Sequence, residues 1–108
     1  MDFSDDETKL LETNDLDKFA KIVQMGFEYP ESFVGAFSSR MKLINNKLDS
    51  KFYFLEQNSE IVSCCSYFKH TNSSLYCAMN ATTLPEYRRS GMAKKLIQKS
   101  SQDIEEKF

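Results

Sequence analysis

The chain has 108 residues, of which 41% are hydrophobic and 28% charged, and its formal net charge is −2. This length allows one domain or part of one, and the composition is that of an ordinary globular protein. The weak acidity gives no overall field to attract nucleic acid or an anionic membrane, and the apolar runs are far shorter than a membrane span. We therefore expect no nucleic-acid partner and no membrane partner.

The cysteines, Cys64, Cys65 and Cys77, lie in apolar runs without the spacing of metal ligands. An odd number, with two of them adjacent, argues against a disulfide framework and against a zinc site. The first nine residues are acidic and lack the apolar stretch of a secretory signal. We expect three reduced, mostly buried thiols, no metal and a cytoplasmic location.

The first half of the chain predicts one strand and two helices. A short strand is expected at residues 9–12, and apolar residues at helical spacing then predict a helix over 15–27. Asn14 is placed to cap that helix by accepting from the amide of Asp17. The Pro30–Glu31 pair favours the first turn of a second helix, which reaches about residue 48.

The second half predicts three strands and one helix. Strands at 51–57, 61–70 and 75–83 are separated by short polar turns, a pattern typical of an antiparallel meander. Pro85 ends the strand pairing, and a helix follows from Gly91. Its apolar face holds Met92, Leu96, Ile97, Ile104 and Phe108, and its charged face holds Lys94, Lys95, Lys99, Asp103, Glu105 and Glu106.

These elements predict an α+β domain with one sheet and helices packed against it. We expect a single domain over 1–108, built from a strand and two helices (9–50), a three-stranded meander (51–83), and a turn with a helix (84–108). The strand at 75–83 is expected to leave an unpaired edge, which would favour self-association.

The turn that leads into the last helix is a candidate anion site. A helix N-terminus has unpaired amides and a partial positive charge, so small residues there let the backbone approach an anion. Gly91 lacks a Cβ, Ser90 can cap the helix, and the arginines suit phosphate. A pyrophosphate is therefore a sensible ligand for residues 88–93. The alternative is a common Ser-Gly helix start beside two solvated arginines.

The stretch LPEYRRSGMAKKLI (84–97) resembles the acetyl-CoA-binding signature of the GCN5-related N-acetyltransferases (GNAT). The core of that signature, Gln/Arg-x-x-Gly-x-Gly/Ala, is matched by Arg88, Gly91 and Ala93. The order of elements is also similar to the family, from about residue 9 to the end of the chain. The resemblance implies a GNAT-like α+β fold with a mostly antiparallel sheet, and it implies that the family's C-terminal strands are missing here.

The resemblance also implies where acetyl-CoA would bind. The amides of about Arg89 to Ala93 would hold its pyrophosphate, and the backbone near Ala81 to Thr83 would lie along its pantetheine arm. The cofactor-binding residues implied are Ala81, Thr82, Thr83, Arg88, Arg89, Ser90, Gly91, Met92 and Ala93. Arg89 stands where the family often has glycine, so its side chain either clashes with the cofactor or reaches a phosphate.

No catalytic residue can be assigned from the sequence. Acetyl transfer to an amine needs a base, but the strand at 75–83 has no Asp, Glu or His. Its polar side chains are Cys77, Asn80, Thr82 and Thr83, and the nearest titratable groups are Glu56, Glu60 and His70. Phe27, Tyr29, Phe33 and Phe37 would either line an acceptor pocket between the first two helices or pack those helices on the sheet.

Our leading interpretation is an N-acetyltransferase, or its cofactor-binding portion, that uses acetyl-CoA and a small-molecule or peptide amine. The alternative is a non-catalytic, self-associating interaction module that retains a GNAT half-fold. Three explanations would account for the missing C-terminal strands. The chain would be an N-terminal piece of a longer enzyme, which we favour, or a unit completed by a second copy, or a natural half-domain.

Overall fold

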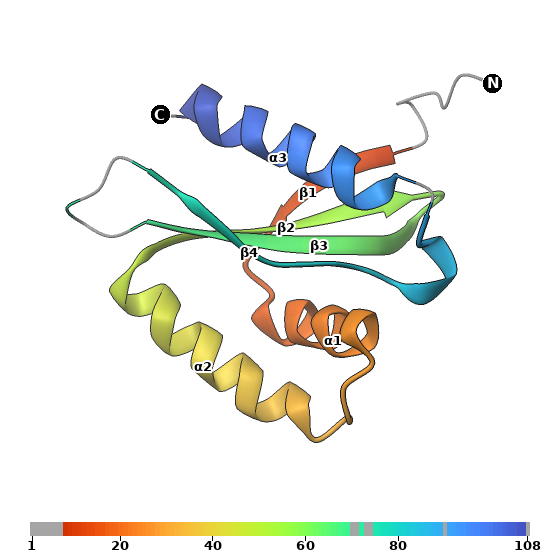
Figure 1. The fold of residues 1–108 in the computed structure, drawn as a ribbon. Helices are drawn as coiled ribbons and strands as arrows, with labels where there is room; N and C mark the ends of the chain where they lie inside the picture. The colour runs from red at the N-terminus through yellow and green to blue at the C-terminus, as the bar shows by residue number, and fades with distance from the viewer. Residues whose placement is uncertain (1–7, 70–71, 73–74, 90, 108) are drawn as a thin grey trace.

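A computed structural model describes residues 8–69, 72, 75–89 and 91–107. The elements follow in the order β1 (Thr8–Thr13), α1 (Leu16–Phe27), α2 (Phe33–Lys47), β2 (Asp49–Gln57), β3 (Glu60–Lys69), β4 (Cys77–Thr83), the 3₁₀ turn η2 (Pro85–Tyr87) and α3 (Met92–Lys107) (Figure 1). The predicted α+β class and the predicted order of elements are confirmed.

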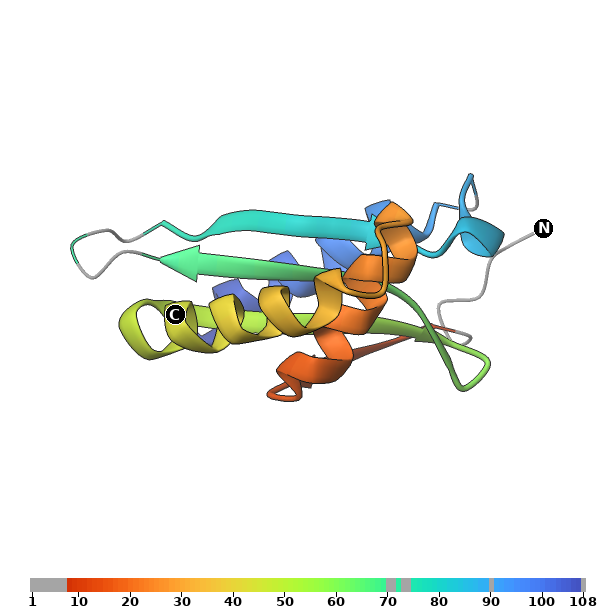
Figure 2. The ribbon, with the colours of Figure 1, turned by 90° about the horizontal axis from the view of Figure 1, so that it is seen from below.

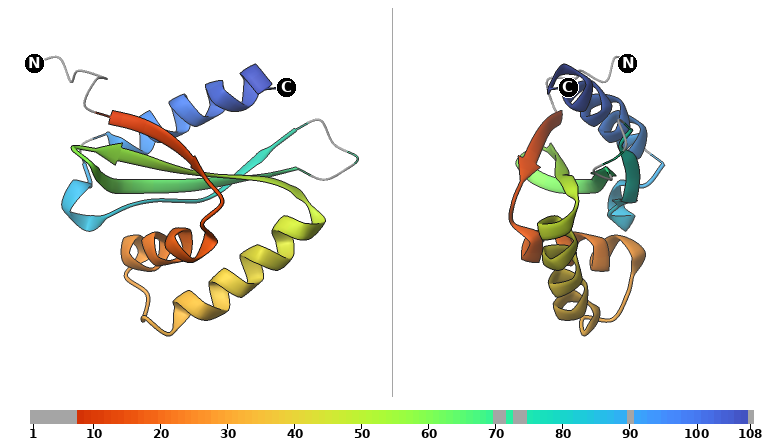
Figure 3. Two further views of the ribbon diagram at one scale, coloured as in Figure 1. Left: turned by 180° about the vertical axis from the view of Figure 1, so that it is seen from behind. Right: turned by 90° about the vertical axis from the view of Figure 1, so that its left-hand side faces the viewer.

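One four-stranded sheet organises the molecule. Its strand order is β1-β2-β3-β4, and all neighbouring strands are antiparallel. The helices α1 and α2 cover one face of the sheet and α3 covers the other (Figures 1 and 2). Seen end-on, β1 and β4 form the two opposite edges (Figure 3, right). Among the described residues no strand pairs with the outer side of β4, as the sequence predicted.

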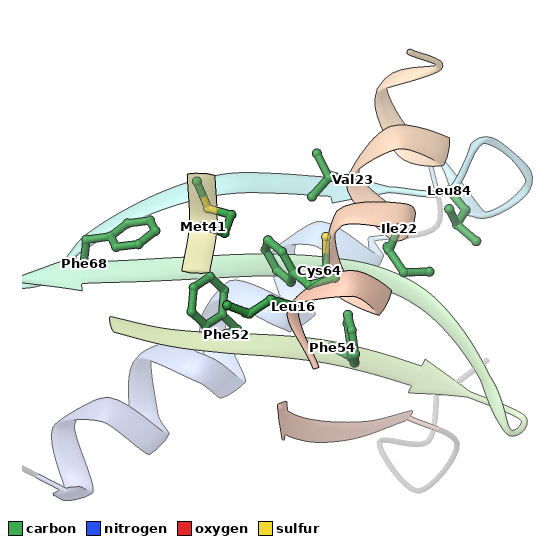
Figure 4. Packing of buried hydrophobic residues seen from close by; sticks show 10 residues of the cluster. Leu16, Ile22, Val23, Met41, Phe52, Phe54, Cys64, Phe68 and Leu84 are labelled. Atoms are coloured by element: carbon green, nitrogen blue, oxygen red, sulfur yellow. The ribbon is translucent and has the colours of Figure 1, made fainter. Parts of the chain in front are cut away.

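The core has two layers because both faces of the sheet are covered. Successive residues of β2 point to opposite faces, so Phe52 and Phe54 pack under α1 and α2, whereas Tyr53 and Leu55 pack under α3. In the first layer the ring of Phe19 meets that of Phe52 edge-on at 5.0 Å between centroids. Figure 4 shows this layer. Because both faces of β2 are buried, the middle of the strand is an unbroken run of apolar residues.

The predicted cap of α1 is wrong by one residue. The carboxylate of Asp15, not the side chain of Asn14, accepts from the helix, at 3.0 Å from the amide of Lys18. The amide of Asp15 in turn donates to Thr13 Oγ1 at 3.0 Å. Two adjacent residues were suitable acceptors, and this second bond fixes Asp15 in the capping position.

The second helix begins at Phe33, two residues later than predicted. The carbonyls of Pro30 and Glu31 accept from the amides three residues on, at 3.0 and 3.1 Å, and therefore form tight turns rather than a first α-helical turn. Ser32 precedes the helix without a capping bond from its side chain.

Two further expectations need correction. Asp103, predicted on the solvated face of α3, is half-buried and accepts from the hydroxyl of Tyr53 at 2.8 Å. Cys77 is exposed, whereas Cys64 and Cys65 are buried as predicted. An apolar residue in a strand resembles core in the sequence, but Cys77 lies on the edge strand β4, where the helices do not cover it. Phe108, which was predicted on the apolar face of α3, lies outside the described residues.

Candidate cofactor site at the β4–α3 turn

The chain passes from β4 to α3 through a short, well-anchored turn. The amide of Leu84 donates to the carbonyl of Val62 at 2.8 Å, and the 3₁₀ turn η2 follows at once. The first bond of α3 runs from the amide of Lys95 to the carbonyl of Gly91 at 3.0 Å. The amides of Met92 and Ala93 lie before that bond and therefore have no partner within the helix.

Two residues of the turn have left-handed backbones, Arg89 with φ 67° and Gly91 with φ 78°. Glycine adopts this conformation freely, whereas a residue with a Cβ incurs a steric cost. An ideal Cβ on Gly91 would have no neighbour within 4 Å, so the glycine is required by its backbone and not by crowding. At Arg89 the chain therefore uses a conformation that suits glycine.

The side chain of Arg88 points to the end of α1. Its Nη2 donates to the carbonyl of Gly26, and its Nη1 lies 3.6 Å from the carboxylate of Glu28. Glu28 is the C-cap of α1 and has a left-handed backbone with φ 58°. Arg88 therefore ties the turn to the helix on the other side of the strand, and its role in holding a phosphate stays a prediction.

The strand and helix α1 approach each other closely at Gly26. A β-carbon added to this glycine would lie 2.4 Å from Thr82 Oγ1 and 2.6 Å from Thr82 Cγ2, well inside contact distance. The absence of a side chain thus lets the helix pack directly on β4. A glycine within a helical pattern was the available signal in the sequence, although the sequence gives no indication of its partner.

A bulge interrupts β4 just before this contact. Two residues of β4, Asn80 and Ala81, lie opposite one residue of β3, Cys65. Asn80 has a φ of 58°, and its side-chain amide donates to Ser66 Oγ at 3.1 Å. Ser66 Oγ in turn donates to the carbonyl of Met79 at 3.0 Å. A bulge of this kind leaves the extra residue without regular strand pairing, and the sequence did not predict it.

The predicted cofactor residues differ in accessibility. Thr82, Thr83 and Met92 are buried, and Met92 belongs to the core under α3, so only its backbone can serve a ligand. The exposed members are Ala81, Arg88, Arg89, Gly91 and Ala93. Ser90 lies outside the described residues. The fold therefore brings the end of β4 and the start of α3 to one end of the sheet, as a ligand spanning both would require.

One of the titratable groups considered as catalysts, Glu60, contacts this turn. The hydroxyl of Tyr87 donates to the carboxylate of Glu60, and this hydrogen bond raises the pKa of Tyr87. Glu56 lies on β2 opposite Lys9, and His70 is outside the described residues. Among the residues that the structure describes, no group of three or more His, Cys, Asp or Glu side chains is arranged to hold a metal ion.

An aromatic series runs from the α1–α2 connection into the core. The rings of Phe27, Tyr29, Phe33 and Phe37 follow one another at centroid distances of 5.5, 4.7 and 4.8 Å. Phe33 and Phe37 pack on the first core layer, whereas Phe27 and Tyr29 are exposed. The inner pair therefore packs the helices on the sheet, one of the two alternatives considered, and an acceptor pocket lined by the outer pair stays a prediction.

No model of a protein family matches the sequence, and no curated protein matches it either. Solved structures do match the fold. An aminoglycoside acetyltransferase from an uncultured soil metagenomic sample, in complex with sisomicin, superposes with a TM-score of 0.66 at 21% identity, over 95% of this chain and 73% of that one.

Two further structures agree with this result. PaiA N-acetyltransferase from Thermoplasma acidophilum, in complex with coenzyme A, gives a TM-score of 0.63 at 16% identity, over 92% of this chain and 74% of its own. A GNAT family acetyltransferase from Staphylococcus aureus gives 0.60 at 19% identity, over 88% of this chain and 74% of its own.

The fold and the turn define an α+β domain with the fold of these acetyltransferases. More particularly, the chain has the GNAT fold through α3, and it covers about three quarters of the neighbouring structures named above. The predicted resemblance to that fold is confirmed. None of the described helices is long and apolar enough to cross a membrane.

Proposed function

We propose that this chain belongs to the GNAT family and serves as an acetyl-CoA-dependent N-acetyltransferase, or as the cofactor-binding portion of one. The observation that carries the proposal is the turn before α3. There the left-handed Gly91, the unpaired amides of the first helical turn and the exposed arginine at position 89 meet at the end of β4. Such a helix start favours a bound pyrophosphate.

In this proposal the protein binds and orients the thioester without a metal. The amides around Gly91 to Ala93 hold the pyrophosphate, and the backbone of residues 81–83 lies along the pantetheine arm. The nitrogen of a primary amine attacks the acetyl carbonyl carbon, the C–S bond breaks, and the amine proton is transferred to the coenzyme A thiolate. We place the protein in the cytoplasm, where three unpaired cysteines stay reduced.

The acceptor is proposed to be a small-molecule or peptide amine. One neighbouring structure is that of an aminoglycoside acetyltransferase in complex with sisomicin. The exposed rings of Phe27 and Tyr29 lie on the α1 side of the sheet, and α1 contacts β4 through Gly26. An amine bound over these rings would approach the strand that carries the cofactor, and a cation there would gain from the ring faces.

Calorimetric titration of acetyl-CoA into the 108-residue chain tests the cofactor site. Gly91→Asp places a negative charge at the proposed pyrophosphate, and Gly91→Asn gives the same backbone change without the charge. Gly35→Asp is the matched control, because Gly35 is exposed near the start of α2 with nothing within 4 Å of an ideal Cβ.

We expect saturable binding in the wild type and in Gly35→Asp, weaker binding in Gly91→Asn, and a further loss of about tenfold or more in Gly91→Asp, since each 1.4 kcal/mol of repulsion costs a factor of ten. Circular dichroism confirms that each variant is folded. A folded wild-type chain that does not bind, or equal binding by the two Gly91 variants, would contradict the assignment of the pyrophosphate to this turn.

A further inference from the structure

Arg88 joins two parts of the molecule that the proposed function assigns to different substrates. Its backbone belongs to the turn proposed to hold the cofactor, and its side chain reaches the end of α1, which carries Phe27 and leads to Tyr29. We propose that Arg88 is a positioning residue whose guanidinium caps α1 and holds these two rings in place relative to the cofactor turn. The inference rests on the proposed function, which assigns the rings to the amine acceptor.

The carbonyl of Gly26 has no regular partner within α1. A helical carbonyl accepts from the amide four residues further on, and here that residue is Pro30, which has no N–H. The amides of Glu28 and Tyr29 donate to earlier carbonyls of the helix. Gly26 is buried, so a carbonyl without a donor would cost free energy there. Nη2 of Arg88 donates to this carbonyl and takes the place of the missing amide.

The charge of Arg88 also suits the end of α1. A helix C-terminus carries a partial negative charge, which a nearby cation stabilises. The last turn of α1 contains no basic residue, so Arg88 supplies this cation from another element. The carboxylate of Glu28, the C-cap of α1, lies 3.6 Å from Nη1. Both terminal nitrogens of the guanidinium therefore face α1, and a phosphate would have to compete with these contacts.

The capped segment carries the two exposed rings. Glu28 has a left-handed backbone and turns the chain, so that Nε2 of Gln24 donates to the carbonyl of Tyr29 at 2.6 Å. The ring of Tyr29 stacks on that of Phe27 at 5.5 Å between centroids and meets Phe33 at 4.7 Å. Because Phe27 and Tyr29 flank the C-cap, their arrangement depends on how α1 ends.

The same end of α1 is held against β4, so one small region sets the place of the rings relative to the cofactor strand. A Cβ added to Gly26 would lie 2.4 Å from Thr82 Oγ1. Figures 1 and 2 show the end of α1 beside the turn that follows β4. Arg88 is a second connection at this place and joins residues 62 positions apart. Its loss would leave the packing at Gly26 in place and release the C-cap with its rings.

NMR of the free 108-residue chain tests this role without a cofactor. Arg88→Met removes the donors and the charge, whereas Arg88→Lys keeps a charged donor of similar length. Arg40→Met is the matched control, because Arg40 is exposed on α2. We expect the amides of Glu28 and Tyr29 to exchange about tenfold faster in Arg88→Met, and to stay near the wild-type rate in Arg88→Lys and Arg40→Met.

The nuclear Overhauser contact between the rings of Phe27 and Tyr29 is the decisive readout. It reports the geometry of the folded state, so a residue that only adds stability would not change it. We expect the contact to be lost in Arg88→Met and kept in Arg88→Lys and Arg40→Met.

Acetyl-CoA separates a positioning role from a phosphate contact. We expect Arg88→Met to bind acetyl-CoA within about threefold of the wild-type affinity and with the same dependence on salt, because the guanidinium makes its bonds to α1. If the guanidinium held a phosphate, this variant would lose about tenfold or more in affinity and part of the dependence on salt. Calorimetry at two salt concentrations measures both.

Two results would overturn the proposal. One is an Arg88→Met chain in which the rings of Phe27 and Tyr29 keep their contact, whatever its stability. The other is the loss of salt-dependent acetyl-CoA affinity in that variant. A wild-type chain that does not bind acetyl-CoA would contradict the proposed function instead, and the ring contact in the free chain would still decide whether Arg88 holds the end of α1.

Discussion

Gly26 in α1 and Thr82 in β4 are in direct contact, and a β-carbon on Gly26 would lie 2.4 Å from Thr82 Oγ1. We therefore expect Gly26→Ala to lower the free energy of unfolding by about 1–3 kcal/mol, as overpacking does in other cores. Urea denaturation followed by circular dichroism measures this change.

The chain offers a matched control at Gly35. That glycine also lies within a helix, but an added Cβ would have no neighbour within 4 Å. Gly35→Ala should raise the free energy of unfolding by about 0.5–1 kcal/mol, because alanine is the better helix former. Adding Thr82→Ala to Gly26→Ala should recover part of the lost stability. If Gly26→Ala were stabilising, as Gly35→Ala should be, the close packing of α1 on β4 would be wrong.

The contact of Arg88 with Glu28 predicts a small, salt-sensitive coupling between the turn and α1. Their side chains are 45% and 67% exposed and their charged atoms lie 3.6 Å apart. A double-mutant cycle with Arg88→Gln and Glu28→Gln should give a coupling free energy of about 0.2–1 kcal/mol at low salt, typical of exposed pairs. The coupling should shrink in concentrated salt, because screening weakens exposed pairs. Coupling that is unaffected by salt would point to a contact other than the ion pair.

The left-handed backbone of Arg89 predicts that glycine is preferred there over alanine. Arg89→Gly removes the steric cost of a φ of 67°, whereas Arg89→Ala removes the charged side chain and keeps that cost. We expect Arg89→Gly to unfold with a free energy about 1 kcal/mol higher than Arg89→Ala.

The same two variants decide what the Arg89 side chain does. If it reaches a phosphate of acetyl-CoA, both substitutions should weaken binding equally and reduce its dependence on salt. If the side chain hinders the cofactor, both should tighten binding. Calorimetry at two salt concentrations distinguishes these results.

The buried Tyr53 predicts a loss of stability in alkali. Burial, together with the hydrogen bond to Asp103, raises the pKa of Tyr53 far above its usual value. Above a pH of about 10, tyrosine in the unfolded chain loses its proton while Tyr53 in the folded chain keeps it. The unfolded state then binds fewer protons, so the free energy of unfolding falls as pH rises.

Tyr53→Phe should therefore show a smaller fall between neutral and alkaline pH than the wild type. At neutral pH the variant should be less stable by about 1–3 kcal/mol, because Asp103 loses a hydrogen-bond donor. Urea denaturation at both pH values gives the comparison. An equal alkaline loss in the variant would mean that other groups control the transition.

The order of strands and helices could be predicted because apolar periodicity records which faces are buried. Leu16, Phe19 and Val23 marked α1, and the short polar turns marked the meander. The exact cap could not be chosen, since Asn14 and Asp15 are both good acceptors and a bond to Thr13 decides between them. The exposure of Cys77 was missed because the sequence does not show how far the helices cover the edge strand β4.

The candidate site could be located from the sequence, but its geometry could not. Arg88, Gly91 and Ala93 identified the turn. The contact of Arg88 with Gly26 joins residues 62 positions apart, which no local pattern records. The left-handed backbone at Arg89 could not be predicted either, because an arginine in the sequence does not indicate that conformation.

The bulge at Asn80 and Ala81 also changes the phase of side-chain alternation along β4. Before it, Cys77 and Met79 lie opposite Phe68 and Ser66; after it, Thr82 lies opposite Cys64. Because Phe68 and Cys64 share the layer under α1 and α2, odd-numbered residues face that layer before the bulge and even-numbered ones after it. Deletion of one bulge residue would therefore rotate one half of the strand and turn Met79 to the α3 side or Thr82 away from Gly26. Only while that extra residue is present can Met79 and Thr82, from the two halves of β4, both face the layer under α1 and α2.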